Sequence, residues 1–147
     1  MHGINSRNNL CVDVDKVSRS HNQARFAFPD SPTYEHHGLI FRSRTEIQIF
    51  EALVKRRVLF CPLPVAVMGE IGIYREPDFL IFHRGRSGVL EIHGSEFHPP
   101  ETAAQEHDRR RRFIDLGVNE YEVYDATRCY NEPDRVVGDF LVRLVKK

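Results

Sequence analysis

The chain has 147 residues, enough for one domain with a hydrophobic core, and its composition suggests neither disorder nor a fibrous repeat. No stretch approaches the ~20 apolar residues of a membrane span, and the N-terminus has no apolar segment of the secretory kind, so we expect a cytoplasmic protein without a membrane partner. The formal net charge of +0 counts against a strong non-specific nucleic-acid binder. The 3 cysteines are widely separated, which argues against a disulfide framework and a Cys-based zinc site.

The sequence changes character near residue 39. Residues 1–38 are polar and weakly patterned, so we expect a partly ordered lead-in with a short strand over 25–28. Pro29 and Pro32 interrupt the chain after that strand. Residues 39–147 alternate apolar runs with capping signals, which predicts a compact α/β domain.

Three segments carry helix signals. Ser43-Arg44-Thr45-Glu46 matches a capping box, which predicts a helix running to about residue 55. A second helix should begin at 99–102 and end near 116, since proline stands at its start and Gly117 just past its end. A third should begin within 131–134, because the apolar residues that follow recur at helical spacing. That apolar stripe consists of Val136, Val137, Phe140, Leu141 and Leu144.

The remaining apolar runs read as strands. The run 58–67 contains Pro62 and Pro64, which fits a strand with one exposed edge, and 121–124 is a further short strand. Between them, runs over 75–82 and 89–93 flank a glycine-containing segment and predict a β-hairpin. The order is helix, three strands, helix, strand, helix. We therefore expect an α/β fold with a mixed sheet flanked by helices and a C-terminal helix.

Acidic residues interrupt this hairpin where apolar residues would be expected, and burying a carboxylate without a partner is costly. A type II′ turn at Gly85-Arg86 would set Leu80 opposite Glu91 and Asp78 opposite His93. All of these side chains would then share one face of the sheet, because a two-residue turn preserves the alternation. Opposed Cβ atoms lie ~5 Å apart, a separation that a bound divalent ion can bridge.

Such a site suits phosphodiester hydrolysis, since a metal held by carboxylates can activate a water and stabilise the leaving oxygen. Asp78 and Glu91 would supply the acids and the backbone carbonyl of Ile92 a third oxygen ligand. His93 would handle a proton or a charge. A structural reading is also open, in which Asp78 begins a strand at the sheet rim and Glu91 faces outward.

The pattern Pro77-Asp78, a strand, then Glu91-x-His93, in this order of elements, resembles the PD-(D/E)xK nuclease superfamily. Within it, residues 41–144 are similar to small bacterial proteins related to very-short-patch repair endonucleases. The resemblance implies a restriction-endonuclease-like α-β-β-β-α-β core. The pieces that carry it further are Phe41-Arg42-Ser43-Arg44-Thr45-Glu46, Arg75-Glu76-Pro77-Asp78-Phe79-Leu80, Leu90-Glu91-Ile92-His93-Gly94, Phe97-His98-Pro99-Pro100, His107-Asp108 and Tyr124-Asp125-Ala126-Thr127-Arg128-Cys129.

The resemblance implies a metal-dependent endonuclease that hydrolyses phosphodiester bonds in DNA with Mg²⁺ or Mn²⁺, and it leaves a homodimer open. It gives Glu46 a second role beside helix capping, as a catalytic acid that reaches the metal through water. The superfamily's usual lysine is His93 in this chain. Histidine can act as a base or ligate a metal, so the alternative is a catalytically degenerate nuclease-fold module that binds DNA.

Basic residues near these motifs are candidates for substrate contacts. Arg44, Arg109 and Arg111 are expected to contact DNA phosphates, which would make binding salt-dependent. The other members of the 109–112 run point elsewhere around the helix and should be solvated.

Histidines add one expectation and one rival reading. His98 is expected near the mouth of the site, where it would help to hold substrate. A zinc site formed by His93, His98 and His107 is the rival, and it would make the chain a small metal-sensing or protein-interaction domain.

Overall fold

A four-stranded mixed sheet forms the centre of the molecule. The computed structural model describes residues 22–25, 33–94 and 100–146, the side chains of 100–102 excepted. The strands follow the order β3-β6-β7-β8; β3, β6 and β7 pair antiparallel, and β8 runs parallel to β7. The predicted mixed sheet is thus confirmed. The strands are β3 (Leu59–Pro62), β6 (Phe79–His83), β7 (Arg86–His93) and β8 (Glu120–Asp125).

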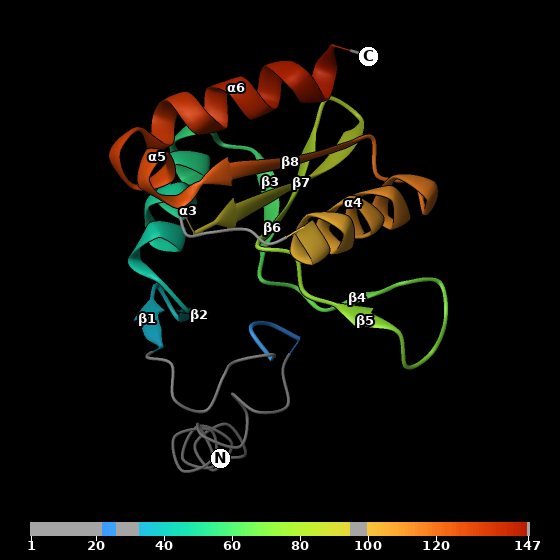
Figure 1. Cartoon of the computed structure of the whole chain (residues 1–147). Helices are drawn as coiled ribbons and strands as arrows, with labels where there is room; N and C mark the ends of the chain where they lie inside the picture. The colour runs from blue at the N-terminus through green and yellow to red at the C-terminus, as the bar shows by residue number, and fades with distance from the viewer. Residues whose placement is uncertain (1–21, 26–32, 95–99, 147) are drawn as a thin grey trace, which may run out of the picture.

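Helices cover both faces of this sheet, as Figure 1 shows. On one face α3 (Arg44–Arg56), α5 (Ala126–Asn131) and α6 (Pro133–Val145) pack over the larger hydrophobic core. On the other face α4 (Pro100–Asp115) covers a smaller core that includes Phe113 and Tyr121. The α/β class with a mixed sheet between helices is therefore as predicted. None of the helices in the described part of the chain is long and apolar enough to cross a membrane.

Alternation along the strands assigns each side chain to one of these two cores. Phe79, Ile81 and Leu90 belong to the larger core, whereas Val89 and Tyr121 belong to the smaller one. Residues adjacent in a strand point to opposite faces, so the odd-numbered positions of β7 face α4. This assignment decides on which face the polar residues of β6 and β7 lie.

The three predicted helices are present as α3, α4 and α6. Ser43 caps α3, and both hydrogen bonds of the capping box are present. The apolar stripe of α6 is buried along its length. The chain turns just beyond α4 at Gly117, whose φ of 115° favours glycine. The short helix α5, which Asp125 caps, was not predicted.

Two small hairpins lie outside the central sheet. The first pairs β1 (Tyr34–His36) with β2 (Leu39–Phe41), so the predicted domain boundary after residue 38 falls within its turn. The second pairs β4 (Ala66–Val67) with β5 (Tyr74–Arg75).

Two predicted strands, over 58–67 and 25–28, are not found as such in the described residues. The single strand over 58–67 is wrong, because the chain leaves the central sheet after Pro62 and turns at Leu63, whose φ is 46°. The strand predicted over 25–28 lies mostly outside the described residues, which here end at Arg25.

The register of the β6–β7 hairpin also differs from the prediction. Phe79 pairs with Leu90 and His83 with Arg86, so the turn residues are Arg84 and Gly85. Both have positive φ, 49° and 74°, which is the type I′ turn rather than type II′. The shift is two residues, so every side chain keeps its expected face.

Candidate active site

Asp78 and Glu91 lie directly opposite one another where β6 begins and β7 approaches its end. The observed register continues from Phe79–Leu90 to this pair, in place of the predicted opposition of Asp78 to His93. The Asp78 backbone N–H donates to Glu91 Oε2 at 2.9 Å, and the Ile92 backbone N–H donates to Asp78 Oδ2 at 2.7 Å. Each carboxylate thus bridges the two strands, and both lie on the face that α4 covers.

Two further acids flank this pair. Glu46 is buried at the start of α3, where its Oε2 accepts the backbone N–H groups of Arg42 at 2.6 Å and Ser43 at 3.3 Å. Glu76 is buried two residues before Asp78. Glu46 therefore fills its capping role, and it is also close enough for its charge to act on Asp78.

Two arginines neutralise part of this acidic group. The Arg42 guanidinium lies 2.9 Å from Glu76 Oε1, 3.5 Å from Asp78 Oδ1 and 3.8 Å from Glu46 Oε1. On the other side, Arg109 of α4 contacts Glu91 Oε1 through NH2 at 2.8 Å and Nε at 2.9 Å. Four carboxylates are thus gathered around two guanidinium groups in the part of the chain that the structure describes.

Burial and the nearness of these charges shift the pKa values of the carboxylates. Burial and the charge of Glu91 raise the pKa of Asp78 well above its ordinary 3.8, although the Ile92 N–H and Arg42 favour the ionised form. Burial likewise raises the pKa of Glu46. For Arg109, burial works against the charge, but Glu91 and Tyr121 outweigh it and the pKa is raised. A cation bound between Asp78 and Glu91 would offset the repulsion between their charges and make ionisation of Asp78 less costly.

His93 faces the same cavity two residues beyond Glu91. The cavity is about 230 Å³ in volume and open to solvent. The His93 imidazole Nε2 contacts Glu106 Oε1 of α4, which fixes the ring at the cavity wall. The described residues that line the cavity are Glu76, Asp78, Glu91, Ile92, His93, Glu106, Arg109, Tyr121 and Val123. Asp78, Glu91, Ile92 and His93 are thus brought together, as the sequence analysis expected.

The arginines predicted to contact substrate do not all lie at this cavity. Arg109 reaches the site but contacts Glu91. Arg44 is exposed on α3, with its guanidinium 5.9 Å from the centre of the Tyr34 ring, and neither it nor Arg111 lines the cavity. Arg111 lies 3.5 Å from His107 on the exposed side of α4.

The described residues include two of the three histidines of the rival zinc site, His93 and His107. His98 lies outside them, while His93 contacts Glu106 and His107 faces Arg111. The described residues contain one group of three His, Cys, Asp or Glu side chains whose ligand atoms all lie within 4.8 Å of one another, and it lies elsewhere, at His36, His37 and Glu51.

Sequence reasoning missed four members of the site, namely Arg42, Glu76, Glu106 and Tyr121. Tyr121 donates its hydroxyl to Glu91 Oε1 at 3.0 Å and also contacts Arg109. Glu76 carried a signal, since it is a second acid in the run that contains Asp78. The others come from α4, β8 and the turn before α3, and no spacing along the chain links them to the hairpin.

Comparison with known proteins gives no family model, curated protein or solved structure that matches this chain.

Proposed function

We propose that this chain is a metal-dependent endonuclease that hydrolyses DNA phosphodiester bonds, built on a restriction-endonuclease-like core. The observation that carries the proposal is the direct opposition of Asp78 and Glu91 in one open cavity, with His93 beside them. With the small β4–β5 hairpin set aside, the order α3, β3, β6, β7, α4, β8 supports the core assignment, because it is the α-β-β-β-α-β order that the sequence resemblance implies.

The donor set fits Mg²⁺ or Mn²⁺ in type, since hard divalent ions prefer carboxylate and carbonyl oxygens. Asp78, Glu91 and the Ile92 carbonyl would hold the ion directly, and Glu46 would act through water. The direct opposition of two carboxylates and the raised pKa of Asp78 favour a cation there. When bound, the ion would supply a water of lowered pKa and polarise the scissile phosphate.

The chain's own residues would position substrate and move a proton. His93 stands at the cavity wall with Glu106 orienting its ring, where it can accept a proton from an attacking water. Arg109 holds Glu91 Oε1 and also lines a second cavity, together with Arg75, Arg112, Gln105, Glu106 and Asp108. These guanidinium groups would contact DNA phosphates.

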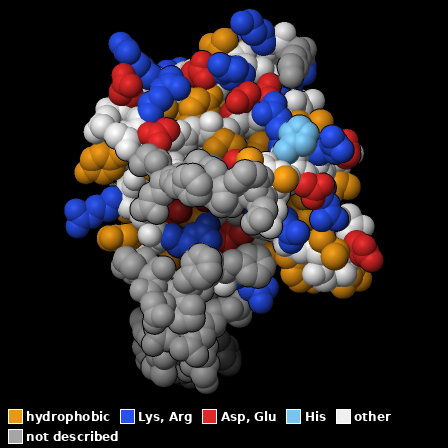
Figure 2. Space-filling view, viewed as in Figure 1, with side chains coloured by type: hydrophobic (Ala, Val, Ile, Leu, Met, Phe, Trp, Pro, Cys, Tyr) orange, Lys and Arg blue, Asp and Glu red, His pale blue; other side chains and the backbone are white. Residues whose placement is uncertain are grey.

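A second function, DNA binding without turnover, is favoured by the two arginines. Arg42 and Arg109 occupy carboxylate oxygens that an ion would otherwise bind. Basic and acidic side chains are interspersed among the described residues on the face shown in Figure 2, an arrangement that favours neither of the two functions over the other. A degenerate module of this kind would bind DNA in a salt-dependent manner and ignore chelators.

The deciding experiment is a cleavage assay on plasmid and single-stranded DNA with Mg²⁺, Mn²⁺ or a chelator, beside a binding assay at two salt concentrations. The nuclease proposal expects cleavage that requires metal and is lost in Asp78→Asn. Asp139→Asn is the matched control, because Asp139 accepts hydrogen bonds from Tyr124 and Arg143, away from the cavity. Cleavage that persists with chelator or in Asp78→Asn would refute the nuclease, and binding without cleavage would select the module.

A further inference from the structure

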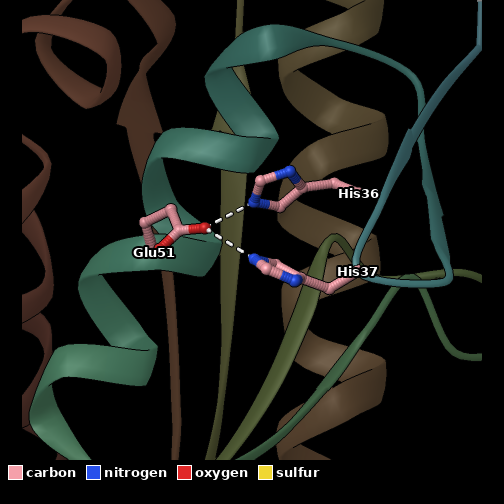
Figure 3. A group of neighbouring side chains, drawn as sticks. All are labelled: His36, His37 and Glu51. Atoms are coloured by element: carbon pink, nitrogen blue, oxygen red, sulfur yellow. Dashed lines mark hydrogen bonds and ion pairs between the residues drawn. The ribbon is translucent and has the colours of Figure 1, made fainter.

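A second cluster of ligand-type side chains lies on the β1–β2 hairpin, apart from the acidic site. Glu51 Oε1 of α3 contacts Nε2 of His36 and lies 3.7 Å from Nε2 of His37. Figure 3 shows both imidazoles pointing at this one carboxylate. The three ligand atoms lie within 4.8 Å of one another.

The backbone of the hairpin turn brings the two histidines together. Neighbouring residues in a regular strand point to opposite faces, so His36 and His37 would normally diverge. Here His37 and Gly38 are the turn residues, with φ of 52° and 78°. Positive φ is costly for a residue with a side chain, and such positions gather at binding sites. The turn aims the His37 ring at the same point as that of His36.

Aromatic packing holds both rings in place. Phe50 is buried, and its ring centre lies 5.6 Å from that of His36 in an edge-on contact. The His37 ring stacks on Phe50 at 6.3 Å and meets His36 edge-on at 4.4 Å. The imidazoles are thus oriented by the core, which lowers the entropic cost of binding a ligand.

We propose that His36 Nε2, His37 Nε2 and Glu51 Oε1 form a binding site for a transition-metal ion of the Zn²⁺ type. Two imidazoles and one carboxylate are a recurrent zinc ligand set that leaves a fourth position for water. Zinc-bound nitrogens and oxygens lie about 2.0–2.2 Å from the ion, so ligand atoms must sit within about 4 Å of each other. Small side-chain rotations meet that requirement from the observed arrangement.

The exposure of the cluster fits a metal that enters from solvent. The His37 side chain is 70 % exposed and that of Glu51 is 42 % exposed, whereas that of His36 is 30 % exposed. A bound ion would join the hairpin to α3 and stabilise both. Mg²⁺ should bind weakly at this site, because it prefers oxygen donors and two of the three donors are imidazole nitrogens. The site does not depend on the proposed nuclease function.

The test compares Zn²⁺ and Mg²⁺ binding to the full chain by equilibrium dialysis with metal analysis, and by thermal melts with and without each ion. The informative variants are His37→Asn and Glu51→Gln. Asn-Gly is the preferred type I′ turn, so His37→Asn should keep or raise the melting temperature without metal. The matched control is His83→Asn, which removes a half-buried histidine from a different hairpin.

We expect the wild type to bind one more Zn²⁺ per chain than His37→Asn or Glu51→Gln. The affinity of this site should fall by at least about a hundredfold in both variants, since even indirect supporting groups cost 10–100-fold. Zn²⁺ should raise the melting temperature of the wild type and of His83→Asn, but not of His37→Asn. Unchanged zinc stoichiometry in folded His37→Asn and Glu51→Gln, or displacement of zinc by Mg²⁺, would overturn the proposal.

Discussion

Two clusters, each of a tyrosine, a carboxylate and an arginine, lie on opposite faces of the sheet and differ in the burial of their acids. On the α4 face, Tyr121 and Arg109 both contact the Glu91 carboxylate. On the α6 face, Tyr124 donates to Asp139 Oδ2 at 2.7 Å, and Arg143 Nε donates to the same oxygen at 2.9 Å. The two tyrosines are three residues apart on β8, which is why they point to opposite faces.

At Asp139 both donors reach one oxygen and the pKa reflects this, although Arg143 also lies 3.7 Å from Glu122 Oε1. The hydrogen bond from Tyr124, followed by Arg143, lowers the pKa of Asp139. In the other cluster, Glu91 is joined by a second carboxylate directly opposite, and burial together with Glu91 raises the pKa of Asp78. A Tyr–carboxylate–Arg group is therefore structural where its acid is partly exposed and has a lowered pKa, and it becomes a candidate cation site where a second, buried acid lies directly opposite.

The largest expected effect separates the two clusters by activity. Glu91→Gln keeps an oxygen to accept from Arg109 and Tyr121 but removes the charge, so DNA cleavage should fall by about 10³-fold, as when an electrostatic stabiliser is lost. Asp139→Asn should change the cleavage rate less than about threefold. Equal losses in the two variants, measured as initial rates on plasmid DNA, would show that the difference between the two clusters has no functional meaning.

Arg109→Gln should turn the acidic cluster into a stronger cation site. Glu91 loses its charged partner, so the protein without metal should be destabilised by about 1–3 kcal/mol in denaturant melts. Mg²⁺ should restore most of that loss and bind about tenfold more tightly, equivalent to ~1.4 kcal/mol. Arg143→Gln is the control on the other face, where Mg²⁺ should have no effect. A loss in Arg109→Gln that metal does not reverse would favour the DNA-binding module.

Asp78→Asn tests the raised pKa directly. Because the folded protein binds this proton more tightly than the unfolded chain, the ionised Asp78 destabilises the fold as pH rises above 3.8. Asp78→Asn should therefore raise stability at neutral pH by roughly 0.5–2 kcal/mol, with the gain vanishing below that pH. Thermal melts of the wild type and of Asp78→Asn, recorded across pH in the presence of chelator, measure this gain in stability. A variant less stable than the wild type at pH 7 would contradict it.

The smallest expected effect is on stability and concerns the cluster at Asp139. The pKa of Asp139 is lowered in the fold, so its contribution is present above its ordinary value of 3.8 and is lost as pH falls through the folded value. Since Asp139 is partly exposed, Tyr124→Phe should cost at most ~1 kcal/mol at pH 7 and less in acid. The pH dependence of the melting temperature, compared with that of Tyr121→Phe, would show whether the two tyrosines play distinct roles.

Local signals in the sequence determined the elements that need only near neighbours. The capping box at Ser43 fixes the start of α3, and the stripe of α6 is buried as its spacing predicts. The common face of Asp78 and Glu91 also follows from the sequence, because any two-residue turn preserves the alternation of the strands.

Tertiary packing decided the rest. The hairpin turns at Arg84 and Gly85, which sets Gly88 under α6, where a Cβ would lie 2.7 Å from Phe140. That contact joins residues far apart in the chain, so no pattern within the hairpin reveals the register.

The ionic partners of the site have the same origin. Arg42 and Arg109 reach the acids from α3's leading turn and from α4, while His36, His37 and Glu51 meet only because a hairpin folds against a helix. Charge balance depends on these long-range pairings. The sequence therefore specified which chemical groups are available, and the packing of helices on the sheet decided which of them meet.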